Sequence, residues 1–175
     1  MKTILSFIIV SLFISLSGQA QEMKYFDIKE GNTYVSFLPK MDTIPSDFRV
    51  QSFQSEKSRA YMSEVLQDVA KQCLSPELAQ KIVRERASAT VYFNANGEVF
   101  YLHFIFSKEL KPFIREDDLL KLYRGYRAIR FDMTKIDTTP MDRVSRNPSD
   151  PFKYATWQFS LRKLAELVVP QPEPE

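Results

Sequence analysis

The chain has 175 residues, and its 24 basic and 22 acidic side chains leave a formal net charge of only +2. This balance excludes the strong basic field by which proteins hold nucleic acid or an acidic membrane surface, so we expect no nucleic-acid partner. The only cysteine, Cys73, excludes an internal disulfide, and stability must therefore come from a packed core.

The first 20 residues have the three parts of a cleavable secretory signal peptide. Lys2 supplies the positive start, Ile4 to Leu16 the apolar centre, and Gly18 and Ala20 the small residues before the cleavage point. The apolar centre spans about 13 residues, whereas a permanent membrane helix needs roughly 20. We therefore expect cleavage before Gln21 and a periplasmic or secreted protein without a permanent membrane anchor. An uncleaved anchor is the alternative.

The first half of the mature chain predicts one strand and two helices. Thr33–Leu38 alternates as an edge strand would. Glu56–Cys73 has apolar residues at helical spacing. Ser75, followed by Pro76 in the first helical position, predicts the start of a second helix that runs to about Arg86.

A β-hairpin is predicted next. The β-rich runs Ala89–Phe93 and Val99–Phe106 flank Asn96-Gly97, a dipeptide typical of tight hairpin turns. Strict alternation in the second run places two apolar sets on opposite faces: Phe100, Leu102, Phe104 and Phe106 on one, and Val99, Tyr101, His103 and Ile105 on the other. A strand that is apolar on both faces is expected in the centre of a covered sheet.

The last third predicts a helix from Glu116, an exposed loop over Thr138–Pro151 and a half-buried strand over Phe152–Leu161. The final residues 170–175, rich in proline and glutamate, are expected to be disordered. Residues 21–169 then form one α+β domain of two layers. Its helices pack on an antiparallel sheet of three or four strands.

From Ser75 onward the chain resembles the C-terminal domain of the TonB family. The stretch from Pro76 to Val99 is similar to that family's proline-started helix and first hairpin, and Asn96-Gly97-Glu98-Val99 matches its turn. The segment Tyr126-Arg127-Ala128-Ile129-Arg130-Phe131 is similar to the cluster that ends its next helix. The resemblance covers residues 75–163 and implies a periplasmic setting. It also implies a last strand, Tyr154–Leu161, that takes up a partner peptide by strand pairing.

Two departures bear on function. Energy-transducing members of the family keep an uncleaved membrane helix and a long proline-rich spacer, where this chain has a signal peptide and the helix Glu56–Cys73. The loop Thr138–Pro151 is also longer than the family's usual link. The resemblance therefore implies the fold without the transducing role.

Catalytic candidates are few. His103 is the only histidine and lies in the middle of a predicted strand, and Cys73 lies on the apolar stripe of its helix, where thiols are usually inert. Glu116-Asp117-Asp118 is expected to stabilise the start of a helix. Arg124, Arg127 and Arg130 are expected to lie in solvent at the end of the same helix. We expect no catalytic residues, no metal and no cofactor, so the protein is not expected to be an enzyme.

The function expected from the sequence is a non-enzymatic interaction module that binds an envelope protein or peptide at a sheet edge. The predicted edge consists of Lys153, Tyr154, Ala155, Thr156, Trp157, Gln158 and Phe159. The alternative is a periplasmic protein that binds a small ligand or lipid in an aromatic-lined pocket, which the aromatic content of 13% would allow. An enzyme that depends on His103 is the third hypothesis. The sequence leaves the oligomeric state open.

Overall fold

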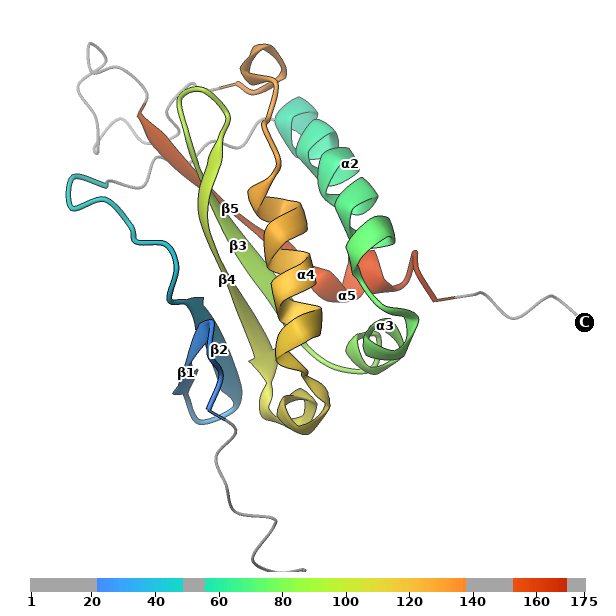
Figure 1. Cartoon of the computed structure of the whole chain (residues 1–175). Coiled ribbons are helices and arrows are strands. Elements are labelled where there is room, and N and C mark those ends of the chain that lie inside the picture. Colours follow the sequence, from blue (N-terminus) through green and yellow to red (C-terminus); the bar gives the residue numbers. More distant parts are fainter. Residues whose placement is uncertain (1–21, 49–55, 138–152, 170–175) are drawn as a thin grey trace, which may run out of the picture.

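A computed structural model describes residues 22–48, 56–137 and 153–169. Its helices lie against one face of a single antiparallel sheet, so the predicted two-layer α+β class is confirmed (Figure 1). The predicted signal peptide, the loop Thr138–Pro151 and the C-terminal tail fall wholly or mainly outside the described residues. Within the described part, no helix has the length and apolarity needed to cross a membrane.

The sheet has five strands rather than the three or four expected. They are β1 (Phe26–Glu30), β2 (Tyr34–Pro39), β3 (Ala87–Asn94), β4 (Val99–Ser107) and β5 (Tyr154–Ser160), in the order β1-β2-β4-β3-β5. The expected edge strand Thr33–Leu38 corresponds to β2, which is not at an edge. It lies between β1 and β4, because β1 folds back on β2 as an antiparallel partner and becomes the outermost strand.

The helices follow the predicted spacing closely. They are α2 (Glu56–Cys73), α3 (Pro76–Ile82), α4 (Glu116–Arg127) and α5 (Leu161–Ala165), with 3-10 turns over Lys108–Phe113 and Met133–Lys135. As predicted, the Ser75 hydroxyl accepts the Leu78 N–H and caps α3, with Pro76 in its first turn. This helix ends four residues before the expected Arg86, because β3 begins at Ala87. No pattern in the sequence predicted α5.

Two acidic side chains at the start of α4, Glu116 and Asp118, have hydrogen-bond or ion-pair partners within the protein. Glu116 Oε1 accepts the Tyr25 N–H at 2.6 Å, which ties the helix to the segment before β1. Asp118 pairs with Arg115 at 2.8 Å. Both carboxylates also lie near the positive end of the helix dipole, as the acidic run at the helix start predicted.

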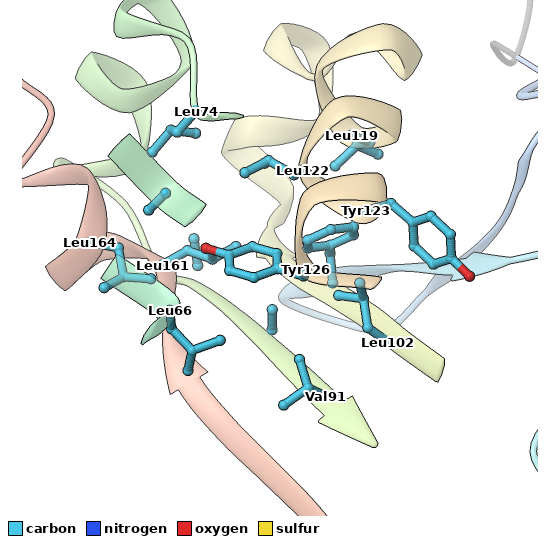
Figure 2. Close-up of a cluster of buried hydrophobic side chains, with 14 of the residues drawn as sticks. Leu66, Leu74, Val91, Leu102, Leu119, Leu122, Tyr123, Tyr126, Leu161 and Leu164 are labelled. Carbon is cyan, nitrogen blue, oxygen red and sulfur yellow. The ribbon is translucent and has the colours of Figure 1, made fainter. Parts of the chain in front are cut away.

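The main core lies between the helices and the sheet. Figure 2 shows Leu119, Leu122 and Tyr126 of α4 among the leucines of α2 and α5 and Val91 and Leu102 of the sheet. A close approach of α2 and α4 depends on Gly125. A Cβ atom there would come within 2.5 Å of the Cys73 sulfur and 2.9 Å of Val69 Cγ1.

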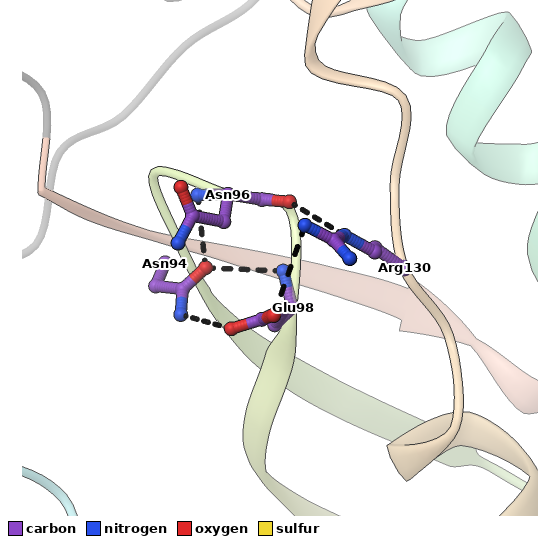
Figure 3. Close-up of polar contacts among 4 residues, drawn as sticks. All are labelled: Asn94, Asn96, Glu98 and Arg130. Carbon is purple, nitrogen blue, oxygen red and sulfur yellow. Dashed lines mark hydrogen bonds and ion pairs between the residues drawn. The ribbon is translucent and has the colours of Figure 1, made fainter.

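The hairpin between β3 and β4 turns at Asn94–Gly97, as predicted. Asn94 Oδ1 accepts the N–H groups of Asn96 and Glu98 at 2.9 and 3.1 Å, and Arg130 contacts Glu98 and the Asn96 carbonyl (Figure 3). Gly97 has φ +79°, and a Cβ atom there would lie 2.0 Å from the Phe131 carbonyl oxygen. The segment after α4 therefore packs on the turn.

Candidate functional site

The predicted binding residues lie at an edge of the sheet. Lys153 immediately precedes β5, and Tyr154 to Phe159 belong to it. Within the described part of the chain, β5 pairs only with β3, with Tyr154 opposite Asn94 and Ser160 opposite Ser88. The other long side of β5 is the position at which a partner strand would add.

Side chains of β5 alternate between the two faces of the sheet. Ala155 is fully buried on the helix side, and Phe159 packs there on Tyr126 with 5.3 Å between ring centroids. Trp157 shares this face and packs against the core. Tyr154, Thr156 and Gln158 lie on the opposite face, which no described helix covers. The half-buried strand predicted from the alternation is confirmed.

The two edges of the sheet differ in charge. At the opposite edge, β1 carries Asp27, Lys29 and Glu30; Asp27 lies 3.6 Å from Lys40, and Glu30 is paired with Lys111. This pairing lowers the pKa of Glu30. Charged side chains of this kind protect an edge from pairing with other chains. By contrast, β5 has the sequence YATWQFS, with no charged residue, proline or glycine.

A β-bulge corrects the predicted faces of β4. Tyr92 pairs with Tyr101 but Phe93 pairs with Val99, so Phe100 is an extra residue in the ladder. As a result Val99 is fully buried in the core, whereas Phe100 joins Tyr101 on the helix-free face. Strict alternation had assigned Val99 and Phe100 to the wrong faces.

The helix-free face holds a second aromatic cluster, separate from the core. We call it the aromatic patch, and it consists of Phe48, Tyr92, Phe100, Tyr101, His103 and Tyr154. Phe48 contacts the rings of Tyr92, Phe100 and Tyr154 at centroid distances of 5.4, 6.1 and 5.6 Å. Tyr92 also contacts Tyr101 and His103 at 5.1 and 5.8 Å. Tyr101 is 8% exposed, and the other five members are partly exposed.

Burial sets the ionisation of the patch. It lowers the pKa of His103 and raises the pKa values of Tyr92 and Tyr101, so all three favour their neutral forms. His103 lies on the helix-free face while Cys73 packs between α2 and α4, so the structure does not bring these two residues together. Among the described residues, no three His, Cys, Asp or Glu side chains gather as metal ligands would.

An open pocket of about 400 Å³ adjoins the patch. Phe100 and Tyr154 supply two ring walls, and Asp42, Thr43, Asn94 and Arg127 supply polar groups. Arg127 Nε donates to Asp42 Oδ2 at 2.9 Å, and the Tyr123 hydroxyl donates to the same oxygen. At the predicted solvated helix end, the Arg127 side chain is 38% exposed and also donates to Asp42 and to the Val99 carbonyl.

A second open pocket, of about 490 Å³, lies at the other end of β4 and is lined by Tyr34, Glu85, Arg86 and Ser88, among others. Both pockets are open and partly polar, unlike the enclosed apolar cavity that would suit a lipid. The sequence does not predict the patch, because the bulge at Phe100 and the position of Phe48 depend on tertiary contacts. The available signal was the aromatic-rich segment from Phe100 to Phe106, which follows Tyr92 across the predicted hairpin turn.

Comparison with known proteins does not assign the chain to a family. No protein-family model matches the chain, and a search of curated proteins gives no significant match. A solved structure of a DUF5043 family protein from Bacteroides uniformis is similar over 77% of this chain and 82% of that one. The two sequences are 14% identical, and the TM-score is 0.48.

Proposed function

We propose that this chain is an exported, non-enzymatic interaction module that captures an extended segment of an envelope protein by adding it to the sheet beside β5. The observation behind the proposal is the difference between the two edges. The β1 edge carries three charged residues, two of them in ion pairs, whereas β5 has seven consecutive uncharged residues and, among the described residues, a strand partner on one side only.

Strand addition at β5 would use backbone hydrogen bonds for affinity and side chains for selection. The incoming strand would meet Trp157 and Phe159 on the helix side and Tyr154, Thr156 and Gln158 on the other. A suitable partner segment is therefore apolar on one face and uncharged on the other. The TonB resemblance supports the same edge, since it implies peptide uptake at the last strand, while the signal peptide supports a location outside the cytoplasm.

Site-specific photo-cross-linking tests the proposal. A benzophenone amino acid replaces Gln158 of β5 in one protein and Lys29 of β1 in a matched control, because both side chains are exposed on edge strands. After illumination in intact cells, we expect a defined envelope partner on Gln158 and none on Lys29. Equal cross-linking at both edges, or none at Gln158, would reject the β5 edge as the binding site.

Proline substitutions separate binding from folding. Neighbouring residues of a strand direct their N–H groups to opposite sides, so proline at Gln158 and proline at Phe159 remove bonds on opposite sides of β5. We expect one variant to lose stability through the β3 ladder and the other to fold normally but lose the cross-linked partner. Strand addition would be contradicted if both proline variants folded stably and still captured the partner.

A further inference from the structure

The helix-free face of β3, β4 and β5 has an unusual chemistry for a chain in which 26% of residues are charged. Its positions alternate from Ser88 to Asn94 on β3, from Tyr101 to Ile105 on β4 and from Tyr154 to Ser160 on β5. None of these side chains is Asp, Glu, Lys or Arg. The face presents aromatic rings, hydroxyls and amides instead, and the neutral form of His103 is favoured by burial.

The pocket beside the aromatic patch continues this chemistry. Phe100 and Tyr154 line it together with the polar side chains of Asp42 and Arg127. These two side chains form an ion pair at 2.9 Å, so the pocket has polar groups without a strong net charge. An anionic ligand would face the Asp42 carboxylate, and a cationic ligand would face the Arg127 guanidinium. Charge therefore favours an uncharged ligand.

The polar groups keep hydrogen-bonding capacity. The Asp42 carboxylate uses one oxygen for Tyr123 and Arg127, and a carboxylate accepts about four bonds in all. The Asn94 amide donates one hydrogen to Glu98 Oε2 and has a second hydrogen. A ligand that both donates and accepts around its rim, and that has an apolar face, would satisfy these groups and the rings together.

We propose that this pocket binds an uncharged sugar unit of an oligosaccharide. The C–H face of a sugar ring is apolar and packs on the electron-rich faces of aromatic rings, while its hydroxyls bond to carboxylate, amide and guanidinium groups. The volume of about 400 Å³ lies within the range of small-molecule sites. The open shape lets a chain of further sugar units continue across the hydroxyl-rich face. This site is independent of strand addition, although Tyr154 borders both.

Titration of the purified protein with neutral oligosaccharides tests the proposal. The probes are cellohexaose, maltohexaose, mannohexaose and N-acetylchitohexaose, with polygalacturonate and palmitate as anionic and lipid controls. Calorimetry should detect binding of at least one neutral sugar, with an affinity that changes little between low and high salt because no net charge is neutralised. Binding of none of the four sugars, or of a control probe alone, would overturn the proposal.

Variants locate the site. Tyr154→Ala should weaken sugar binding by at least about tenfold through loss of a ring wall, whereas Tyr154→Phe should keep most of it. Tyr34→Ala is the matched control, since Tyr34 is a 49% exposed ring of β2 that borders the other pocket. Unchanged near-ultraviolet dichroism shows that the variants fold. Equal weakening of sugar binding by Tyr34→Ala and Tyr154→Ala would also overturn the proposal. So would a protein that binds no sugar but forms a dimer that Tyr154→Ala dissociates, because the patch would then be a contact between two copies of the chain.

Cross-linking at Gln158 keeps the two proposals distinguishable. Sugar binding with no cross-linked partner would reject strand addition alone. A cross-linked partner without sugar binding would reject the sugar site alone.

Discussion

Gly125 of α4 lies directly against Cys73 of α2, and a methyl group at Gly125 would come within 2.5 Å of the Cys73 sulfur. A glycine inside a helix costs about 1 kcal/mol relative to alanine. The sequence alone would therefore predict that Gly125→Ala stabilises α4. The structure predicts the opposite, since the packed side chains of Cys73 and Val69 would have to give way to the added methyl group.

We expect Gly125→Ala to lower the free energy of unfolding by up to about 2 kcal/mol, because overpacking costs about 1 to 3 kcal/mol and the gain in helix propensity only partly offsets it. Urea unfolding measures the change. In a Cys73→Ala background the same substitution should cost clearly less, since the sulfur is gone. A Gly125→Ala protein more stable than the parent would show that the helices are not in close contact.

Gly97→Ala should destabilise the hairpin by about 2 to 4 kcal/mol. Its φ of +79° is strained for alanine, and the added Cβ would lie 2.0 Å from the Phe131 carbonyl oxygen, which is backbone and cannot rotate away. Thermal unfolding measures the loss.

Gly31→Ala is the control for this prediction. Its Cβ would meet the Tyr34 ring at 2.6 Å, but that side chain is 49% exposed and can swing aside. A cost below about 1 kcal/mol is therefore expected. Equal losses at the two glycines would argue against the packing of Phe131 on the turn.

Tyr123 and Tyr126 of α4 should respond differently to loss of the hydroxyl. The Tyr126 hydroxyl is fully buried without a hydrogen-bond partner among the described residues, and its ring points toward Leu161 and Leu164 (Figure 2). The Tyr123 hydroxyl donates to the Asp42 carboxylate. Tyr126→Phe should be neutral or stabilising by about 1 kcal/mol, whereas Tyr123→Phe should cost about 1.5 to 3 kcal/mol.

Denaturant midpoints of the two variants test this contrast. Both substitutions remove one oxygen atom from a buried ring, so each serves as the control for the other. A large loss for Tyr126→Phe would mean that its hydroxyl has a partner, and no loss for Tyr123→Phe would mean that the Asp42 contact contributes nothing to stability.

His103 should make the protein less stable in mild acid. Burial lowers its pKa in the folded state below the ordinary value of 6.5, so the unfolded chain takes up the proton first as pH falls. The contribution of neutral His103 to the free energy of unfolding is fully present above about pH 6.5. It decreases as pH falls from there toward the pKa of His103 in the folded state. Contacts with the rings of Tyr92 and Tyr101 provide no charge that would reverse this sign.

Urea unfolding at about pH 7 and about pH 5 measures the effect. His103→Phe keeps a ring in the patch and should flatten the dependence over this interval. Glu30 and Asp132 have lowered pKa values, so their contribution to stability is lost only as pH falls below their ordinary pKa values of 4.5 and 3.8. Both values lie below about pH 5, so these two carboxyl groups contribute little to a change between about pH 7 and about pH 5. An unchanged pH dependence in His103→Phe would assign it to other groups.

Elements specified by local signals were predicted well. The bounds of the helix Glu56–Cys73 matched the structure, as did the cap at Ser75 and the turn at Asn96-Gly97. Each depends on residues within one or two turns of chain. The predicted helix end at Arg86 was four residues too long, because the start of β3 is decided by its pairing with β4.

The candidate site was predicted in part. The alternation in β5 identified a half-buried strand, and the edge position expected for it is the one that the sheet order gives. The aromatic patch was not predicted. Phe48 reaches Tyr92, Phe100 and Tyr154 across long intervals of sequence, and one inserted residue at the bulge moves Phe100 to the other face.

The sequence by itself determined the class of the fold and most helix and strand positions, because periodicity, caps and turn residues act over short distances. It also predicts export, through an expected signal peptide over residues 1–20, which lie outside the described residues. Only the tertiary structure decided which strand lies at which edge, which rings leave the core and how Asp42 meets Arg127. These features depend on contacts between residues far apart in the chain, which no local pattern encodes.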